Sequence, residues 1–517
     1  MSGRAAGRHP YAALVSRAAT RANQEFADVR WYRGPALGAA VGLVGLQLAY
    51  ATGYGFHRDE LYFLAESQRL SWGYVSEPPF TPALAWLSRQ LFGESLLGLR
   101  LWPALAGGLV VVLATLICRT LGGGRLAQLT TAVCVALSTV WLAIFHLFGT
   151  SAFDQLAWAV ALLIVARLLA GADPRWWLGV GAVAGLGLLN KHTLVLLGVA
   201  LPLGLLLGGR GKLLRGRWPW LGALLALLIV SPNLAWQARN GWPLLDMSAS
   251  ISEAEGGPLG ALLFVPMQLL TLNPFLAPVW LAGLVWLFRA PWFRPLAWTY
   301  LVALAVLMAA GGKFYYLAPM YLVLFAAGGI AVQRWLSART RPRPATLLVA
   351  LAAAGLVAAP VGLPILPATA HADVPVAAAN PDLLETIGWP AHVARIAAVR
   401  DGLPAEERAD AIVLTRNYGQ AGAVERFGAA FGLGRPVSGH NTYWLWGPPP
   451  DERATVIAVG SREGLGLDRA FRDVRPAGRL DNGIGVDNDE QGTPLWICRD
   501  PVAPWPQLWP TFRRYVA

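Results

Sequence analysis

Two acidic residues stand side by side in a short polar segment between apolar stretches, Arg58-Asp59-Glu60-Leu61-Tyr62. A helix that begins near Asp59 would place Asp59 and Tyr62 on one face. Adjacent carboxylates suit the transfer of a group to a hydroxyl or an amine, because one can take the acceptor proton while the other orients the acceptor or a cation. Either carboxylate alone also fits a helix cap or a helix-dipole partner. Asp59 and Glu60 are therefore our candidate catalytic residues.

Lysine is rare in this chain, since only three of the 42 basic residues are lysines. Lys191 and Lys313 both lie next to apolar stretches, where a compact ammonium group can bind a phosphate oxygen. Tyr315 and Tyr316 follow Lys313 and offer phenols to a phosphate or a sugar. A lysine that snorkels from an aromatic belt is the alternative interpretation. We predict that these four residues bind substrate.

Further acidic residues stand at the ends of apolar stretches. Glu77 precedes Pro78 and Pro79, and a Pro pair fixes the backbone in a way that could aim the carboxylate into a cavity. Asp154 opens an apolar stretch and could equally cap a helix. Together with His146, these two acids could bind a divalent cation. The sequence establishes no metal site and no firm cofactor.

The elements that carry these residues are apolar and long. Of 517 residues, 55% are hydrophobic and only 14% are charged, against about 25% charged in soluble domains. This composition excludes an ordinary soluble enzyme and a disordered chain. Because about 20 apolar residues cross a bilayer, we predict eleven membrane spans, and we expect 258–272 to be an interfacial helix. The spans are 36–53, 99–118, 127–146, 153–170, 176–190, 194–208, 218–236, 274–288, 295–311, 314–333 and 345–366.

Basic residues predict how the spans are oriented. With the N-terminus inside, the inner loops, together with Arg167 at a span end, hold 20 Lys and Arg and three acids, as the positive-inside rule requires. The N-terminus is then cytoplasmic, and the C-terminal part and the candidate site residues lie outside. The net charge of +12 belongs to the first 366 residues, which have a net charge of +15, whereas residues 367–517 have −3. No basic run is interleaved with aromatic residues, so we expect no nucleic-acid partner.

The tail has the pattern of a second folded region. Short strands are expected at 411–415, 443–446 and 454–459, and helices at 383–400 and 420–430, which predicts an α/β or α+β domain. We therefore divide the chain into three parts: a cytoplasmic N-terminal arm (1–35), a transmembrane domain (36–366) and an extracytoplasmic C-terminal domain (370–517).

The sequence resembles bacterial membrane glycosyltransferases of the dolichyl-phosphate-mannose–protein mannosyltransferase type, which include the lipid A aminoarabinose transferases. The resemblance covers roughly 36–366. It is carried by residues 58–65, Trp72-Gly73-Tyr74, Pro78-Pro79, Asp154 and the segments 187–193 and 313–319. This sequence differs from the family's pattern at Glu77, which itself precedes the Pro pair. Its tail also does not match the sugar-binding-like insert of the protein mannosyltransferases.

The resemblance implies a polytopic α-helical membrane protein with about eleven transmembrane helices in the C-type glycosyltransferase arrangement. It implies an inverting enzyme with a polyprenyl-phosphate-linked sugar donor. Asp59 then maps onto the base, Glu60 onto its acidic partner and Lys313 onto the group that faces the lipid phosphate. We place further substrate contacts at Arg58, Tyr62, Glu77, Asp154, Lys191, Tyr315 and Tyr316.

The expected function is therefore sugar transfer in the cell envelope, on the outer face of a bacterial plasma membrane. The expected partners are the donor, membrane lipid and an acceptor that could be a protein, a lipid or a cell-wall glycan. A lipid-linked-sugar flippase or other transporter is the alternative, and a receptor without catalysis is another. A transporter would concentrate ionisable residues at mid-membrane, often in a repeated architecture, whereas this chain has them at the outer ends and shows no repeat.

Overall fold

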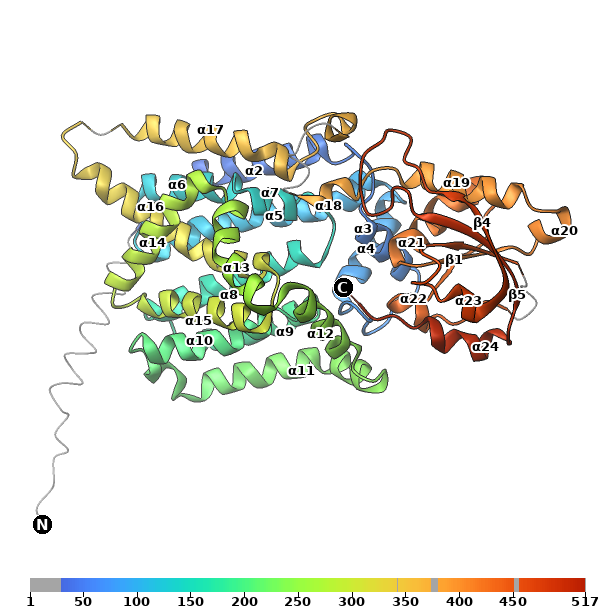
Figure 1. The fold of residues 1–517 in the computed structure, drawn as a ribbon. Coiled ribbons are helices and arrows are strands. Elements are labelled where there is room, and N and C mark those ends of the chain that lie inside the picture. The colour runs from blue at the N-terminus through green and yellow to red at the C-terminus, as the bar shows by residue number, and fades with distance from the viewer. Residues whose placement is uncertain (1–28, 342, 373–379, 451–454, 517) are drawn as a thin grey trace, which may run out of the picture.

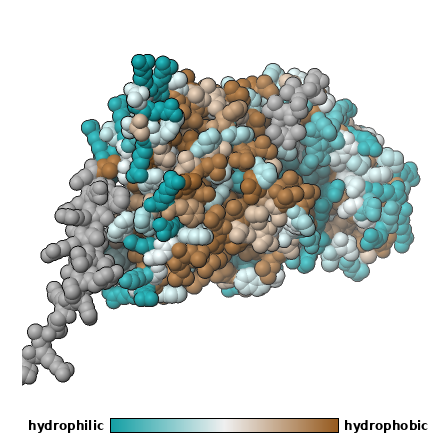
Figure 2. Space-filling model, turned by 60° about the vertical axis from the view of Figure 1, so that its left-hand side comes forward, coloured by the Kyte–Doolittle hydropathy of each residue, from teal (hydrophilic) through white to brown (hydrophobic). Residues whose placement is uncertain are grey.

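The computed structural model of the protein describes residues 29–341, 343–372, 380–450 and 455–516. Long helices lie roughly alongside one another, and a small sheet with its own helices lies beyond one end of them (Figure 1). On the face seen in Figure 2, a hydrophobic belt separates two hydrophilic ends, as expected of a protein that crosses a bilayer.

A helix, or two helices with a short break, lies at each of the eleven ranges expected to cross the membrane. Five of these segments are long and apolar enough to do so: α5, α8, α11, the segment Phe314–Ser337 and α17. The helical elements are α2 (Arg33–Tyr50), α3 (Arg58–Glu66), α4 (Phe80–Phe92), α5 (Leu96–Thr120), α6 (Arg125–Ala136), α7 (Thr139–Ile144), α8 (Thr150–Leu169), α9 (Trp176–Leu188), α10 (Leu194–Leu207), η1 (Gly211–Leu214), α11 (Arg217–Arg239), α12 (Pro243–Glu255), α13 (Gly257–Thr271), η2 (Pro274–Leu276), α14 (Ala277–Arg289), α15 (Arg294–Ala310), η3 (Phe314–Met320), α16 (Tyr321–Ser337) and α17 (Pro344–Gly362).

Two of the predicted ranges differ in shape from a simple span. The range 127–146 is divided between α6 and α7, and 258–272 forms α13, which meets the following segment Pro274–Arg289 at 83°. Such a bend is typical of a broken span or a re-entrant loop. The total of eleven crossings and the three domain boundaries stay predictions, and residues 1–28 of the N-terminal arm lie outside the described residues.

The C-terminal part contains a mixed five-stranded sheet with the strand order β2-β1-β3-β5-β4. β1 runs parallel to β2 and β3, and β5 runs antiparallel to β3 and β4. The strands are β1 (Ile412–Thr415), β2 (Val437–Ser438), β3 (Val456–Val459), β4 (Phe471–Arg479) and β5 (Pro494–Pro501). The helical elements are η4 (Ala368–Ala372), α18 (Pro381–Leu384), α19 (Trp389–Asp401), α20 (Ala405–Arg408), α21 (Tyr418–Phe427), η6 (Gly428–Phe431), α22 (Thr442–Leu445), α23 (Leu467–Ala470), α24 (Trp505–Leu508) and η7 (Trp509–Phe512).

The prediction of a strand at 443–446 is wrong. These residues belong to a short helix, α22, because Asn441 has φ +48° and the chain turns there. The ring of Tyr443 in α22 lies beside the ring of Tyr62, with 6.0 Å between their centroids, so the segment packs on the membrane part rather than in a sheet.

The two longest strands, β4 and β5, were not expected. β4 contains charged residues and Pro476 at a register shift, which an edge strand tolerates.

Helix α21 of the C-terminal part packs directly on α3, the helix that carries Asp59. Two glycines allow this approach. A Cβ atom at Gly419 would lie 2.7 Å from the Cβ of Arg58, and one at Gly422 would lie 2.9 Å from the carbonyl carbon of Leu61. The backbones of the two helices are therefore in contact, and α21 fixes the outer side of the site.

Replacing Gly422 by Leu should separate α21 from α3, because the new side chain meets backbone that cannot rotate away. Overpacking typically costs about 1–3 kcal/mol. Thermal denaturation of the purified protein in detergent should show a lowered midpoint. Gly434→Ala is the matched control, since its new Cβ meets no atom within 4 Å. A wild-type midpoint for Gly422→Leu would contradict this close packing.

Candidate active site

A buried ion pair holds the start of α3. The guanidinium of Arg100, in α5, donates from Nε and from Nη2 to the two carboxylate oxygens of Glu60, each at 2.8 Å. The same guanidinium donates to the carbonyl oxygens of Ala51 and Gly55 at 2.7 Å. Arg100 is 2% exposed and Glu60 is fully buried. Arg100 thus ties the turn between α2 and α3 to the neighbouring membrane helix.

Glu60 has no lone pair left for an acceptor. Besides the two bonds from Arg100, it accepts the backbone N–H groups of His57 and Phe148, each at 2.8 Å. A carboxylate offers about four lone pairs, and all four are used here. The geometry therefore does not support the catalytic role expected for Glu60. It supports a positioning role, in which Glu60 anchors the first turn of α3 through a capping box with His57.

Asp59, one position earlier, faces different surroundings. Its side chain is 43% exposed, and its Oδ1 accepts a 2.8 Å hydrogen bond from the hydroxyl of Tyr418. Burial opposes its ionisation, but the positive charges of His57 and Arg58, 3.9 Å away, outweigh burial and lower the pKa of Asp59. Lys313 adds to the same effect. Asp59 is therefore an ionised carboxylate with one open side.

The two expected lysines share this site. The charges of Lys191 and Lys313 act on each other and on Asp59. The ammonium group of Lys191 donates to Ser151 Oγ at 2.8 Å. Burial lowers the pKa of Lys191 to about 8, although Asp154 favours its charged form. Lys313 is half-buried and has no ion pair or hydrogen bond of its side chain among the residues that the structure describes.

Tyr315, Tyr316 and Asp154 surround Lys191. Its Nζ lies 5.2 Å from the ring centre of Tyr315 and 4.9 Å from that of Tyr316. Asp154, at the start of α8, is buried and accepts a 2.7 Å hydrogen bond from Thr193 Oγ1. The structure therefore brings these three residues and both lysines to the same end of the membrane part as Asp59.

Two buried acids lie at the end of α3. The carboxyl groups of Glu66 and Glu77 are close enough for their charges to act on each other, and neither is more than 6% exposed. Burial raises the pKa of Glu66 well above its usual range and raises that of Glu77 to about 7. Burial and their mutual repulsion both favour the protonated form of the two groups. The charges of Asp59 and Lys191 also act on Glu77, and its substrate-binding role stays a prediction.

Tyr62 and Arg58 contact the C-terminal part rather than an open cavity. The hydroxyl of Tyr62 donates to Thr442 Oγ1 at 2.6 Å, and its ring stacks on Tyr418 at 4.5 Å. Arg58 Nε lies 2.8 Å from a carboxylate oxygen of Glu385. Their substrate-binding role stays a prediction, and their present contacts hold α3 against the C-terminal part.

One group of three residues among those described could hold a metal ion. The ligand atoms of His57, Asp382 and Glu385 lie within 4.8 Å of one another. The guanidinium of Arg58 already compensates Glu385 there. The cation site imagined for His146, Asp154 and Glu77 does not form among the described residues, because His146 lies against Arg100, 3.2 Å between Nε2 and Nη1.

Several residues of the site were not predicted. Arg100 was read as part of a membrane span, and Tyr418 and Glu385 lie more than 300 positions from Asp59 in sequence. Only the unusual presence of an arginine inside an apolar helix could have drawn attention to Arg100.

Replacing Arg100 by Met should destabilise the protein strongly, because it leaves the Glu60 carboxylate buried without its partner. Such changes cost about 3–5 kcal/mol. The denaturation midpoint in detergent should fall steeply for Arg100→Met and recover in part when Glu60→Gln is added, since no buried charge then remains. Arg175→Met, at an exposed position, is the control. Equal midpoints for Arg100→Met and Arg175→Met would refute the anchoring role.

The raised pKa of Glu77 predicts a pH-dependent stability. The ordinary pKa of a glutamate is 4.5 and that of Glu77 in the folded protein is about 7. Between these values the folded state holds a proton that the unfolded state has lost, so stability falls as the pH rises through this window. The denaturation midpoint should be higher at pH 5 than at pH 8, and Glu77→Gln should reduce the difference. Exposed Glu406→Gln should leave it unchanged. If the midpoints of Glu77→Gln at pH 5 and pH 8 differed as much as those of wild type, Glu77 would not be the group responsible.

Comparisons with known proteins find one matching family model and several solved structures with a similar fold. Residues 76–236 match the family model described as dolichyl-phosphate-mannose-protein mannosyltransferase. The structure of ArnT from Cupriavidus metallidurans bound to undecaprenyl phosphate is similar, with a TM-score of 0.57 and 16% identity over 89% of this chain and 97% of that chain. The apo state of the same ArnT gives a TM-score of 0.54 at 16% identity, with the same 89% and 97% covered.

The Archaeoglobus fulgidus oligosaccharyltransferase in the apo form gives a TM-score of 0.44 and 13% identity over 72% of this chain and 59% of that chain. No curated protein sequence matches this chain. The likeness to ArnT extends over most of both chains and shows a shared fold. The resemblance predicted from the sequence is therefore confirmed: residues 76–236 match the dolichyl-phosphate-mannose-protein mannosyltransferase model, and the fold is similar to that of ArnT.

Proposed function

We propose that the protein is an inverting glycosyltransferase that moves a sugar from a polyprenyl-phosphate donor to an acceptor. The observation that carries this proposal is the placement of an ionised, partly open Asp59 beside two lysines of which one, Lys313, has no partner of its own among the described residues. A base and a phosphate-binding cation are the two groups that such a transfer needs.

The reaction is a single displacement. The acceptor hydroxyl or amine gives its proton to Asp59 as its heteroatom attacks the anomeric carbon. The bond between that carbon and the phosphate oxygen breaks on the opposite face, so the anomeric configuration inverts. Negative charge then grows on the leaving phosphate, where Lys313 and Lys191 stabilise it.

Other residues position these groups. Tyr315 and Tyr316 line the ammonium of Lys191, and Asp154 favours its charged form. Tyr418 donates to Oδ1 of Asp59, so Oδ2, which lies 3.9 Å from His57 Nδ1, is the oxygen that accepts the proton. Glu60 keeps the first turn of α3 in place without taking part in proton transfer.

Two comparisons support the donor class. ArnT, whose fold this chain shares, was solved with undecaprenyl phosphate, and the matched family model describes dolichyl-phosphate-mannose-dependent enzymes. The distribution of basic residues supports a bacterial plasma-membrane protein whose N-terminus is cytoplasmic and whose site and C-terminal domain (370–517) face outwards.

Radiolabelled polyprenyl-phosphate sugars, offered one at a time to the purified protein, test the proposal. Wild type should release or transfer the sugar of one donor. Asp59→Asn should lower the rate about 10²–10⁴-fold, because general base catalysis contributes that much. Lys313→Met should lower it about 10²–10³-fold through lost stabilisation of the phosphate.

Asp468→Asn is the control, since it makes the same chemical change at an exposed carboxylate paired with Arg462. A folded Asp59→Asn enzyme with wild-type turnover would overturn the mechanism. Wild type that binds a donor and cleaves none would instead indicate binding or transport.

A further inference from the structure

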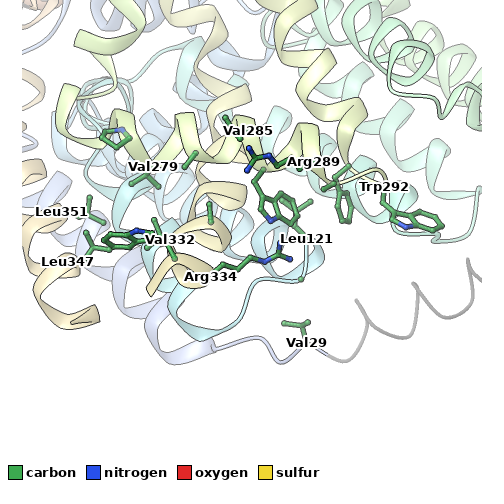
Figure 3. A pocket seen from close by; sticks show the side chains of 18 of the residues that line it. Val29, Leu121, Val279, Val285, Arg289, Trp292, Val332, Arg334, Leu347 and Leu351 are labelled. Carbon is green, nitrogen blue, oxygen red and sulfur yellow. The ribbon is translucent and has the colours of Figure 1, made fainter. Parts of the chain in front are cut away.

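A large groove lies between membrane helices, far from Asp59. It has a volume of about 1260 Å³ and is lined by α14, α16, α17 and the turns beside them. In the close-up, Leu347 and Leu351 lie on one side of the groove and Arg289 and Trp292 on the other (Figure 3). Its size exceeds the 300–1,000 Å³ usual for a pocket that takes a small molecule.

The groove forms because α17 and α14 diverge. α14 packs along α16, whereas α17 packs on α6 and α7. A hydrogen bond connects the start of the α14 segment to α17: the side chain of Asn273, just before η2, donates to the carbonyl oxygen of Ala354 at 3.0 Å. Ala354 lies ten residues into α17 from Pro344, or about 15 Å. The groove thus closes at about half the 30 Å thickness of a hydrocarbon core, the depth of one leaflet.

The mouth of the groove is basic and the rest is apolar. Arg289 ends α14, Arg334 lies near the end of α16, and both are exposed. Neither guanidinium has an ion-pair partner in the part of the chain that the structure describes. Trp286, Trp292 and Trp335 also line the groove, and the ring of Trp286 lies 5.4 Å from the Arg334 guanidinium. Tryptophan and arginine at this depth match the headgroup level of a bilayer.

A second basic cavity adjoins the mouth. It has a volume of about 610 Å³ and contains Arg30, Arg33, Arg119 and Arg125. The first cavity includes Val29 and the second includes the next residue, so the two lie side by side. The positive charge around the mouth is therefore far larger than that of two residues, and it favours an anionic occupant.

The groove is not the donor site described above. α15 runs from Arg294, beside the mouth, to Ala310, close to Lys313, and its 17 residues span about 25 Å. A phosphate at Arg289 and Arg334 would therefore lie near the opposite membrane face from one at Lys313.

We propose that this groove binds an anionic phospholipid of the leaflet at the arginine-rich end. The phosphate contacts Arg289 and Arg334, and the acyl chains fill the space between α14 and α17 down to the Asn273–Ala354 contact. The lipid replaces the helix–helix packing that α17 lacks along α14.

Native mass spectrometry of the full-length protein tests this, after equilibration with equal amounts of phosphatidylglycerol and phosphatidylcholine of the same acyl chains. Each basic residue near an anionic lipid contributes a factor of about five, so Arg289 and Arg334 alone should make wild type retain phosphatidylglycerol about twenty-five-fold better. Arg289→Gln with Arg334→Gln should lower the preference by about twenty-five-fold, because two basic residues are lost. Arg215→Gln with Arg217→Gln removes the same charge at exposed positions outside both cavities and should preserve it.

A steric pair of variants tests the groove itself. Ala350→Trp fills the groove without a change of charge and should prevent retention, whereas Val349→Trp, on the neighbouring exposed face, should not. Equal retention of the two lipids by wild type would overturn the proposal. So would an equal loss in the Arg215/Arg217 variant, or displacement of phosphatidylglycerol by undecaprenyl phosphate at equal concentration.

Discussion

The bidentate contact between Arg100 and Glu60 is the interaction on which the site depends. It joins the long helix α5 to the first turn of α3 and closes the turn that leaves α2. Two charges removed from water are costly, and only complete hydrogen bonding offsets that cost. Here every oxygen of Glu60 is used. Because consecutive residues of a helix point about 100° apart, fixing Glu60 inwards fixes Asp59 towards the opening.

The C-terminal part completes the site that the membrane part begins. Tyr418 holds Asp59, Glu385 compensates Arg58, and Thr442 holds Tyr62. The surroundings of each acidic residue in this region determine the direction in which its pKa is shifted. The cations around Asp59 lower its pKa, whereas burial raises the pKa values of Glu66 and Glu77. A helical membrane part alone would lack half of these partners.

The sequence predicted those features that depend on local pattern. Apolar length located the helices, and the strands at β1 and β3 were found because they are short, buried and β-branched. The convergence of Asp59, Lys191 and Lys313 followed from charge and sidedness. Glu60 was misjudged because its partner Arg100 is 40 residues away, inside a segment that looks like any membrane span. The segment expected as a strand at 443–446 starts with α22 instead, where the chain turns at Asn441 and Tyr443 packs on Tyr62 of α3, a contact that no local pattern encodes.

The close contact between α21 and α3 has a consequence for how substrates are exchanged. A cover that swings open needs a hinge between itself and the residues it covers, but here glycine lets the two backbones touch at Arg58 and Leu61, on either side of Asp59. The C-terminal part cannot lift away without carrying the carboxylate with it. Any motion of the C-terminal part relative to the membrane helices therefore has to move α3 as well, or has to be confined to side chains and loops around Asp59.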